Sequence, residues 1–145
     1  MKYKVCTLIG AAGSYIIGAL VGGWDSALMT LVICMVVDYI SGLVVAAVFK
    51  KSTKSETGAL ESRAGFKGLW RKGMMLLVVL IGNRLDIFLG ISYIQDTVVI
   101  GFIANEIISL IENAGLMGVP IPKVIINAID VLQKKTESED FENGR

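Results

Sequence analysis

Four long apolar stretches, separated by short groups of charged residues, restrict the fold of this chain more than any other feature. A helix needs about 20 mostly apolar residues to cross the hydrocarbon core of a bilayer. Only 19% of the residues are charged, whereas about a quarter are charged in a soluble domain. The pattern therefore predicts an all-α integral membrane protein. The four predicted transmembrane helices cover Val5–Gly22, Ala27–Phe49, Met74–Ile94 and Thr97–Leu116.

The segments between these stretches predict how the chain is oriented. Lys50–Lys72 contains seven Lys and Arg residues against two Glu, and Lys2 and Lys4 precede the first stretch. By contrast, Gly23–Ser26 and Gln95–Asp96 are short and net acidic. Basic segments that flank spans stay in the cytoplasm. Four spans therefore predict a multi-pass membrane protein with the N-terminus, the basic loop and the C-terminus in the cytoplasm.

Two alternatives concern the first and last stretches. Three spans are an alternative to four, because Glu106 and Glu112 interrupt the last stretch, but three would place one basic end outside. Val5–Gly22 also resembles a signal peptide, although no clear cleavage site precedes a soluble domain. We favour a retained span.

The chain divides into three predicted parts. Residues 1–121 form the transmembrane helical domain. Pro122 suits the first turn of a new helix, and apolar residues then follow at helical spacing, so residues 122–135 are predicted to form an amphipathic interfacial helix. Residues 136–145 are polar and acid-rich, which predicts a disordered tail.

Small residues recur at every fourth position of the first two stretches and therefore share one helix face. Small faces let helices approach closely in lipid. The ridges pack helices either within one chain or between copies, and Leu at Gly18 or Gly42 is expected to impair assembly if copies meet there. The predicted packing and oligomerisation residues are Gly10, Ser14, Gly18, Gly22 and Gly42.

Ionisable residues lie near the middle of three predicted spans. Such a residue costs about 2.5–3.5 kcal/mol on insertion scales, so it pairs with another charge or lines water. Arg84 is predicted to pair with Asp38 or Glu106. The cluster either fixes helix register or becomes the hydrophilic surface of a pore. Its predicted members are Asp38, Arg84, Asp86, Asn105 and Glu106.

The end of the basic loop suits a membrane interface. Phe66, Leu69 and Trp70 share a helical face beside basic residues, a pattern typical of contact with anionic headgroups. The alternative is a solvated loop that only sets topology. The predicted interfacial residues are Lys67, Trp70, Arg71 and Lys72.

Composition argues against several functions. The chain has no His, and Cys6 and Cys34 lie separately in apolar stretches, so no catalytic, metal or cofactor residues are predicted. The net charge of +1 does not favour nucleic acid as a partner. We therefore expect a protein that is not an enzyme.

Three stretches resemble the bacteriophage holin family, which includes phage lysis holins and clostridial toxin-secretion holins. The resemblance covers roughly Val36–Lys135, and its last stretch is the most specific. The stretches are Asp38–Gly42; the loop with Ser62, Gly65, Gly68, Arg71 and Lys72; and Asn105–Glu106 with Ser109, Glu112–Asn113 and Gly118–Lys123.

This resemblance implies a non-enzymatic role in host cell lysis. Copies of such proteins accumulate in the cytoplasmic membrane, oligomerise and form holes that release an endolysin or a toxin. The implied partners are membrane lipids, other copies of the chain and an opposing antiholin. The endolysin or toxin passes through the holes without direct contact with the protein. The alternatives are a small transporter or ion channel that uses the intramembrane charges, and a membrane scaffold.

Overall fold

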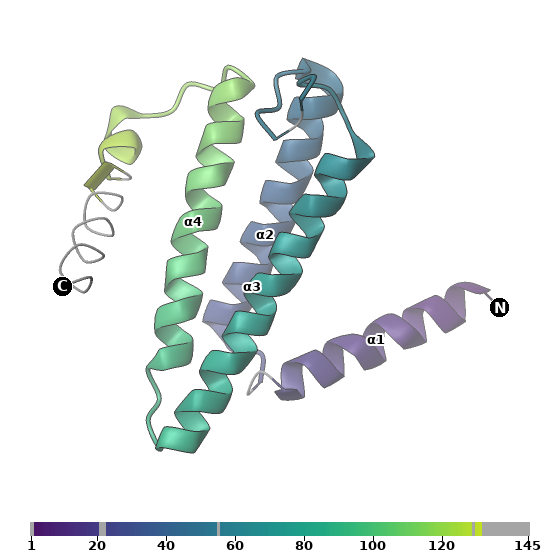
Figure 1. Ribbon diagram of the computed structural model, residues 1–145, viewed down its shortest axis with the longest axis vertical. Coiled ribbons are helices and arrows are strands. Elements are labelled where there is room, and N and C mark those ends of the chain that lie inside the picture. Colours follow the sequence, from purple (N-terminus) through teal and green to yellow (C-terminus); the bar gives the residue numbers. More distant parts are fainter. Residues whose placement is uncertain (1, 21–22, 55, 129, 132–145) are drawn as a thin grey trace.

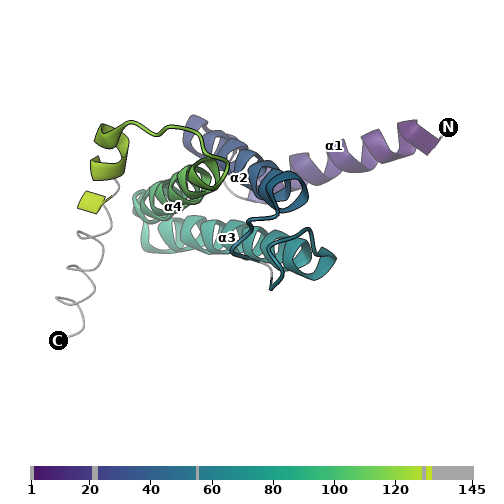
Figure 2. The ribbon, with the colours of Figure 1, turned by 90° about the horizontal axis from the view of Figure 1, so that it is seen from above.

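The computed structural model describes residues 2–20, 23–54, 56–128 and 130–131, and these contain helices but no strand. Helices α2, α3 and α4 form a bundle in which α2 and α4 run in the same direction and α3 runs antiparallel to both, whereas α1 projects away from one end of it (Figures 1 and 2). The prediction of an all-helical chain is confirmed. The elements are α1 (Lys2–Leu20), α2 (Ser26–Val44), the π-helical turn η1 (Val45–Phe49), α3 (Ser62–Leu89) and α4 (Ile94–Leu116).

An apolar core fills one half of the bundle. Leu31 of α2 and Val79 of α3 are fully buried, and Val99 of α4 packs with them. The core residues of α2 recur at intervals of three or four, which keeps them on the face that meets α3 and α4. The buried members of this cluster are Leu28, Leu31, Met35, Met75, Val79 and Val99.

The outer surface of the bundle is also apolar. Ile33, Leu77, Ile81 and Ile100 are each more than half exposed, and they come from three different helices. An apolar exterior of this extent is typical of a surface that contacts a membrane or another protein.

Two helices in the described part of the chain are long and apolar enough to cross a membrane. They are Ser26–Phe49, which joins α2 to η1, and Ile94–Leu116, which is α4. Their position agrees with the second and fourth predicted spans. The other two predicted spans, and with them the four-span arrangement, stay predictions.

Helix α3 begins and ends earlier than the sequence predicts. It begins at Ser62 rather than Met74 and ends at Leu89 rather than Ile94. Gly90 ends the helix because its φ of 69° lies in the left-handed region, where its backbone N–H and that of Ile91 bond to the carbonyl of Asp86. The interfacial segment and the third apolar stretch are therefore one continuous helix.

Asp86 caps the start of the next helix. Its carboxylate accepts hydrogen bonds from the backbone N–H groups of Ile94 and Gln95, each at 2.9 Å. These groups lie in the first turn of α4, where no carbonyl of the helix can accept from them, and a negative charge there is favourable. Asp86 therefore joins α3 to α4, separately from the acids deeper in the bundle.

Replacing Asp86 with Ala is expected to lower the free energy of unfolding by about 1–3 kcal/mol, because two partly buried N–H groups lose their acceptor. Asp96→Ala is the matched control, since Asp96 is an exposed acid in the same first turn of α4. It should cost less than about 1 kcal/mol. Denaturant unfolding of the full chain in detergent, followed by far-UV circular dichroism, measures both. Equal losses would contradict the capping role.

The C-terminal segment is described only in part. Residues 123–128 are helical and exposed, and the carbonyl of Pro122 accepts from the N–H of Ile125 at 3.0 Å. This agrees with a helix that begins near Pro122. The rest of the predicted amphipathic helix is described only at residues 130–131, and the predicted tail 136–145 lies outside the described residues.

Candidate functional site

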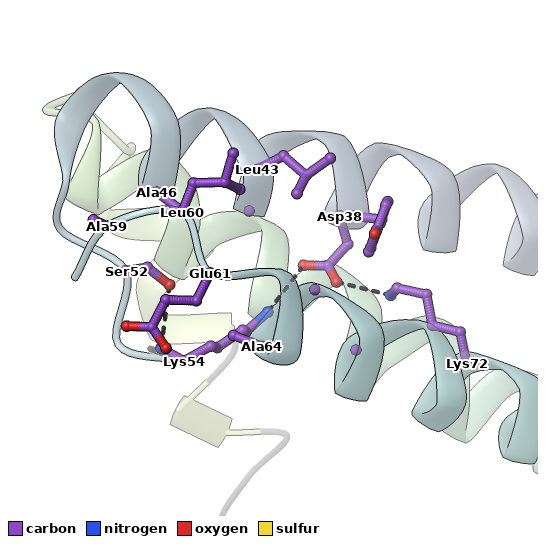
Figure 3. A pocket seen from close by; sticks show the side chains of 14 residues that line it. Asp38, Leu43, Ala46, Ser52, Lys54, Ala59, Leu60, Glu61, Ala64 and Lys72 are labelled. Carbon is purple, nitrogen blue, oxygen red and sulfur yellow. Dashed lines mark hydrogen bonds and ion pairs between the residues drawn. The ribbon is translucent and has the colours of Figure 1, made fainter. Parts of the chain in front are cut away.

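A partly buried lysine joins two buried acids within the bundle. The Lys72 ammonium group of α3 donates to Asp38 Oδ2 of α2 at 2.8 Å, and it also forms an ion pair with Glu106 of α4. The acids are 4% and 3% exposed. Figure 3 shows the Lys72 side chain reaching toward Asp38. Each helix thus supplies one charge, and breaking such a pair leaves a buried charge uncompensated.

Asn113 completes the contacts of Asp38. Its side-chain amide donates to Asp38 Oδ1 at 3.1 Å and to Ser41 Oγ at 2.8 Å. The amide lies 3.8 Å from the position that a Cβ atom would take at Gly42, which is an ordinary van der Waals contact, so only side-chain atoms beyond Cβ could press on it. Asp38 therefore ties α2 to α3 through the lysine and to α4 through the amide. We call Asp38, Lys72, Glu106 and Asn113 the central network.

A partly open cavity leads to the central network from the loop between η1 and α3. Its volume is about 60 Å³, enough for more than one water molecule. Lys54 reaches in from the loop, with its ammonium 3.9 Å from Asp38 Oδ1 and 3.2 Å from Ser109 Oγ. In Figure 3 both lysines point toward Asp38. The polar residues that line the cavity include Asp38, Ser52, Lys54, Glu61 and Lys72.

The loop that carries Lys54 has a defined shape. The backbone N–H of Ser52 donates to the carbonyl of Gly58 at 2.9 Å, and Gly58 has a φ of 75°, which favours glycine. The hydroxyl and N–H of Thr57 donate to the Glu61 carboxylate and lower its pKa. These bonds hold the loop over the cavity at the start of α3.

The structure does not bring Arg84 together with Asp38 or Glu106. Its side chain is exposed and makes no ion pair within the described part of the chain. It lies twelve residues, or about 18 Å along the helix, from Lys72. Lys72 was predicted to contact the interface, and instead it supplies the cation that pairs with the buried acids. Asn105 was predicted to belong to the polar cluster, but it is exposed. The buried side-chain amide that contacts Asp38 belongs to Asn113 instead.

Two of the predicted packing glycines face residues of the same chain. A Cβ atom at Gly18 would collide with the indole of Trp24, whose Nε1 donates to the carbonyl of Ser14 at 3.2 Å. Gly42 faces Asn113. In contrast, nothing lies within 4 Å of a Cβ atom at Gly10. Ser14 is exposed, and Gly22 lies outside the described residues. Contacts between copies at these positions stay a prediction.

The predicted interfacial residues separate into two groups. Lys67, Trp70 and Arg71 are exposed on the outer side of α3, and the rings of Phe66 and Trp70 meet edge to face with centroids 6.0 Å apart. Lys72 lies on the opposite side, within the central network. Contact of the outer group with a membrane stays a prediction.

Comparisons with known proteins agree on one family. The model of the bacteriophage holin family matches residues 15–134, which include the whole central network. An uncharacterized protein of Listeria innocua is 35% identical over 98% of this chain and 97% of its own length. A protein described as a probable holin, from Bacillus phage phi105, is 31% identical over 79% of this chain and 82% of its own length. No solved structure matches the chain.

Proposed function

Because the chain belongs to the bacteriophage holin family, we propose that it oligomerises in the bacterial cytoplasmic membrane and opens non-specific lesions. An endolysin, or a toxin, then crosses through these lesions without binding the protein directly. The similarity to a probable phage holin supports this role. Family membership and the two apolar helices together indicate a membrane protein without enzymatic activity.

The observation that carries the proposal is a charged network largely enclosed by a bundle whose exterior is mostly apolar. Lys72 is paired with Asp38 and Glu106 inside the bundle, so these three charges are kept from lipid. When helices of several copies separate, the same side chains provide a hydrophilic wall. Charged groups that face water avoid the cost of charges that face hydrocarbon.

The proposed topology has four spans with both termini in the cytoplasm. The loop between η1 and α3 and the end of α4 lie at one end of the bundle, opposite the α3–α4 turn (Figure 1). Basic residues concentrate at the loop end, so this end faces the cytoplasm by the positive-inside rule. Lys54 and the cavity then face the cytoplasm. Membrane lipids, further copies and an antiholin are the proposed partners.

The main alternative is a small transporter or ion channel. The cavity that leads to Asp38 favours it, because a small ion requires a path from the surface to a buried charge. Such a protein would pass one class of small solute and retain large proteins. A scaffold that recruits partners through the basic loop would pass neither.

Co-expression with an endolysin tests these functions. The chain is induced together with a cytoplasmic endolysin that lacks an export signal, while culture density and release of a large cytoplasmic enzyme are followed. We expect an abrupt fall in density and release of the enzyme. An inactive endolysin is the control, and it should abolish the fall in density without abolishing enzyme release. Steady growth without release would contradict the holin role.

A further inference from the structure

The first turns of α3 present an exposed face of basic and aromatic side chains. Arg63, Lys67 and Arg71 recur at every fourth residue and form one row along the helix. Phe66 and Trp70 form the adjacent row and are 60% and 64% exposed. We call these five residues the basic–aromatic face.

The packing of α3 fixes the direction of this face. Gly65 and Gly68 lie on the other side of the helix, where their Cβ positions would be 3.5 and 3.9 Å from the side chain of Tyr39 in α2. Lys72 points to that side as well, where it pairs with Asp38. The basic–aromatic face therefore points away from the bundle.

The three basic residues of the face are not neutralised by close acids. Among the described residues, the salt bridges within 4.0 Å involve Lys54 and Lys72 rather than these three. Glu61 lies near enough for Arg63 to contribute to its lowered pKa. A row with an excess of positive charge is therefore available to an anionic partner.

The length of α3 places this face at the level of the headgroups. The helix has 28 residues, which corresponds to about 42 Å, whereas the hydrocarbon core is about 30 Å thick. At the average tilt of about 20°, the helix still covers about 39 Å along the membrane normal. If Leu89 lies at the outer boundary, the first turns extend beyond the inner boundary, and Trp70 lies close to it.

We propose that the basic–aromatic face binds the headgroups of anionic phospholipids in the cytoplasmic leaflet. This inference rests on the proposed membrane placement of α3. Arg63, Lys67 and Arg71 bind phosphate oxygens, for which arginine is well suited geometrically. Phe66 and Trp70 lie at the boundary between headgroups and acyl chains, where aromatic rings are enriched. The exposed rings favour a lipid surface over free phosphate, because a free ion offers them nothing to contact.

Quenching of Trp70 by brominated lipids tests the proposal. The chain has two Trp residues, so Trp24→Phe leaves Trp70 as the reporter. The full chain is reconstituted in mixed phosphatidylglycerol and phosphatidylcholine vesicles in which one lipid at a time is brominated. We expect brominated phosphatidylglycerol to quench more strongly at equal mole fraction. Each basic residue near an anionic surface is worth about a fivefold preference at low salt.

Substitution of the basic row should abolish this preference. A triple variant should be quenched equally by brominated phosphatidylglycerol and by brominated phosphatidylcholine. It combines Arg63→Gln, Lys67→Gln and Arg71→Gln. The control, Lys50→Gln with Lys51→Gln and Lys123→Gln, removes the same charge elsewhere on exposed positions and should retain the preference.

Three outcomes would overturn the proposal. The first is equal quenching by the two lipids in the parent, and the second is an equal loss of preference in the control. The third is loss of the preference on adding millimolar inorganic phosphate at constant ionic strength, which indicates a site for the free ion. In a separate Trp70→Phe variant, quenching of Trp24 reports insertion itself. Insertion without lipid preference would therefore reject this inference and leave the proposed function intact.

Discussion

Lys72→Met is expected to lower the free energy of unfolding by about 3–5 kcal/mol, because it leaves the buried Glu106 carboxylate without a cation and Asp38 with only the more exposed Lys54, 3.9 Å away. Lys72 is the cation that joins Asp38 to Glu106, and its own side chain is only 13% exposed. Methionine keeps a similar length and removes the charge. Unfolding of the full chain in detergent, followed by far-UV circular dichroism at pH 7, measures the loss.

Arg84→Met is the matched control for this experiment. It removes one positive charge from the same helix, but Arg84 is exposed and makes no ion pair within the described residues. We expect a loss below about 1 kcal/mol. Adding Asp38→Asn and Glu106→Gln to Lys72→Met should restore much of the stability, since no buried charge then remains in the network. The central role of Lys72 would be rejected if Arg84→Met were as destabilising.

Gly42→Leu is expected to affect the stability of the bundle, whereas Gly10→Leu is expected to affect self-association. At Gly42 the larger side chain presses on Asn113, whose amide holds Asp38 and Ser41. Overpacking costs about 1–3 kcal/mol, and a displaced buried amide costs about 1–3 kcal/mol more. Gly42→Leu should therefore destabilise the bundle itself. Gly10 faces open space, so Gly10→Leu should leave unfolding unchanged.

The expected effect of Gly10→Leu is on self-association. Crosslinking in membranes measures oligomers, and the endolysin assay measures the delay before lysis. We expect fewer oligomers and a long delay, because the side chain prevents close approach of another helix at this face. Parental oligomers and parental timing would show that copies do not meet at Gly10. A change in the unfolding of the isolated chain would instead show a contact within the bundle.

Sequence patterns predicted the helical class, the positions of α2 and α4, and the two central acids. Asp38 and Glu106 could be recognised because a charge in the middle of an apolar stretch is costly and requires a partner. That argument identifies the need for a cation but not which cation meets it. Arg84 was selected because it lies inside an apolar stretch, whereas Lys72 was counted with the basic loop.

Choosing between Lys72 and Arg84 as the partner of the two acids depended on where α3 begins. Once the helix starts at Ser62, Lys72 lies inside the bundle beside Asp38, whereas Arg84 is about three turns farther along. No local pattern marks this start, since Glu61 precedes it without a side-chain cap bond. Asn113 was missed for a similar reason, because its importance comes from a contact with Asp38, 75 residues earlier in the chain.

The placement of Lys72 also has a consequence for biosynthesis. α2 and α4 meet the conditions for crossing a membrane individually, whereas α3 carries Lys72, Arg84 and Asp86. As the chain emerges from the ribosome, Asp38 is already available when Lys72 follows. If α3 spans the membrane as proposed, the translocon could therefore accept α2 and α3 as a hairpin in which Asp38 and Lys72 are paired, before α4 has been made. The ion pair that stabilises the finished bundle would then also help its least apolar helix to leave the translocon for lipid.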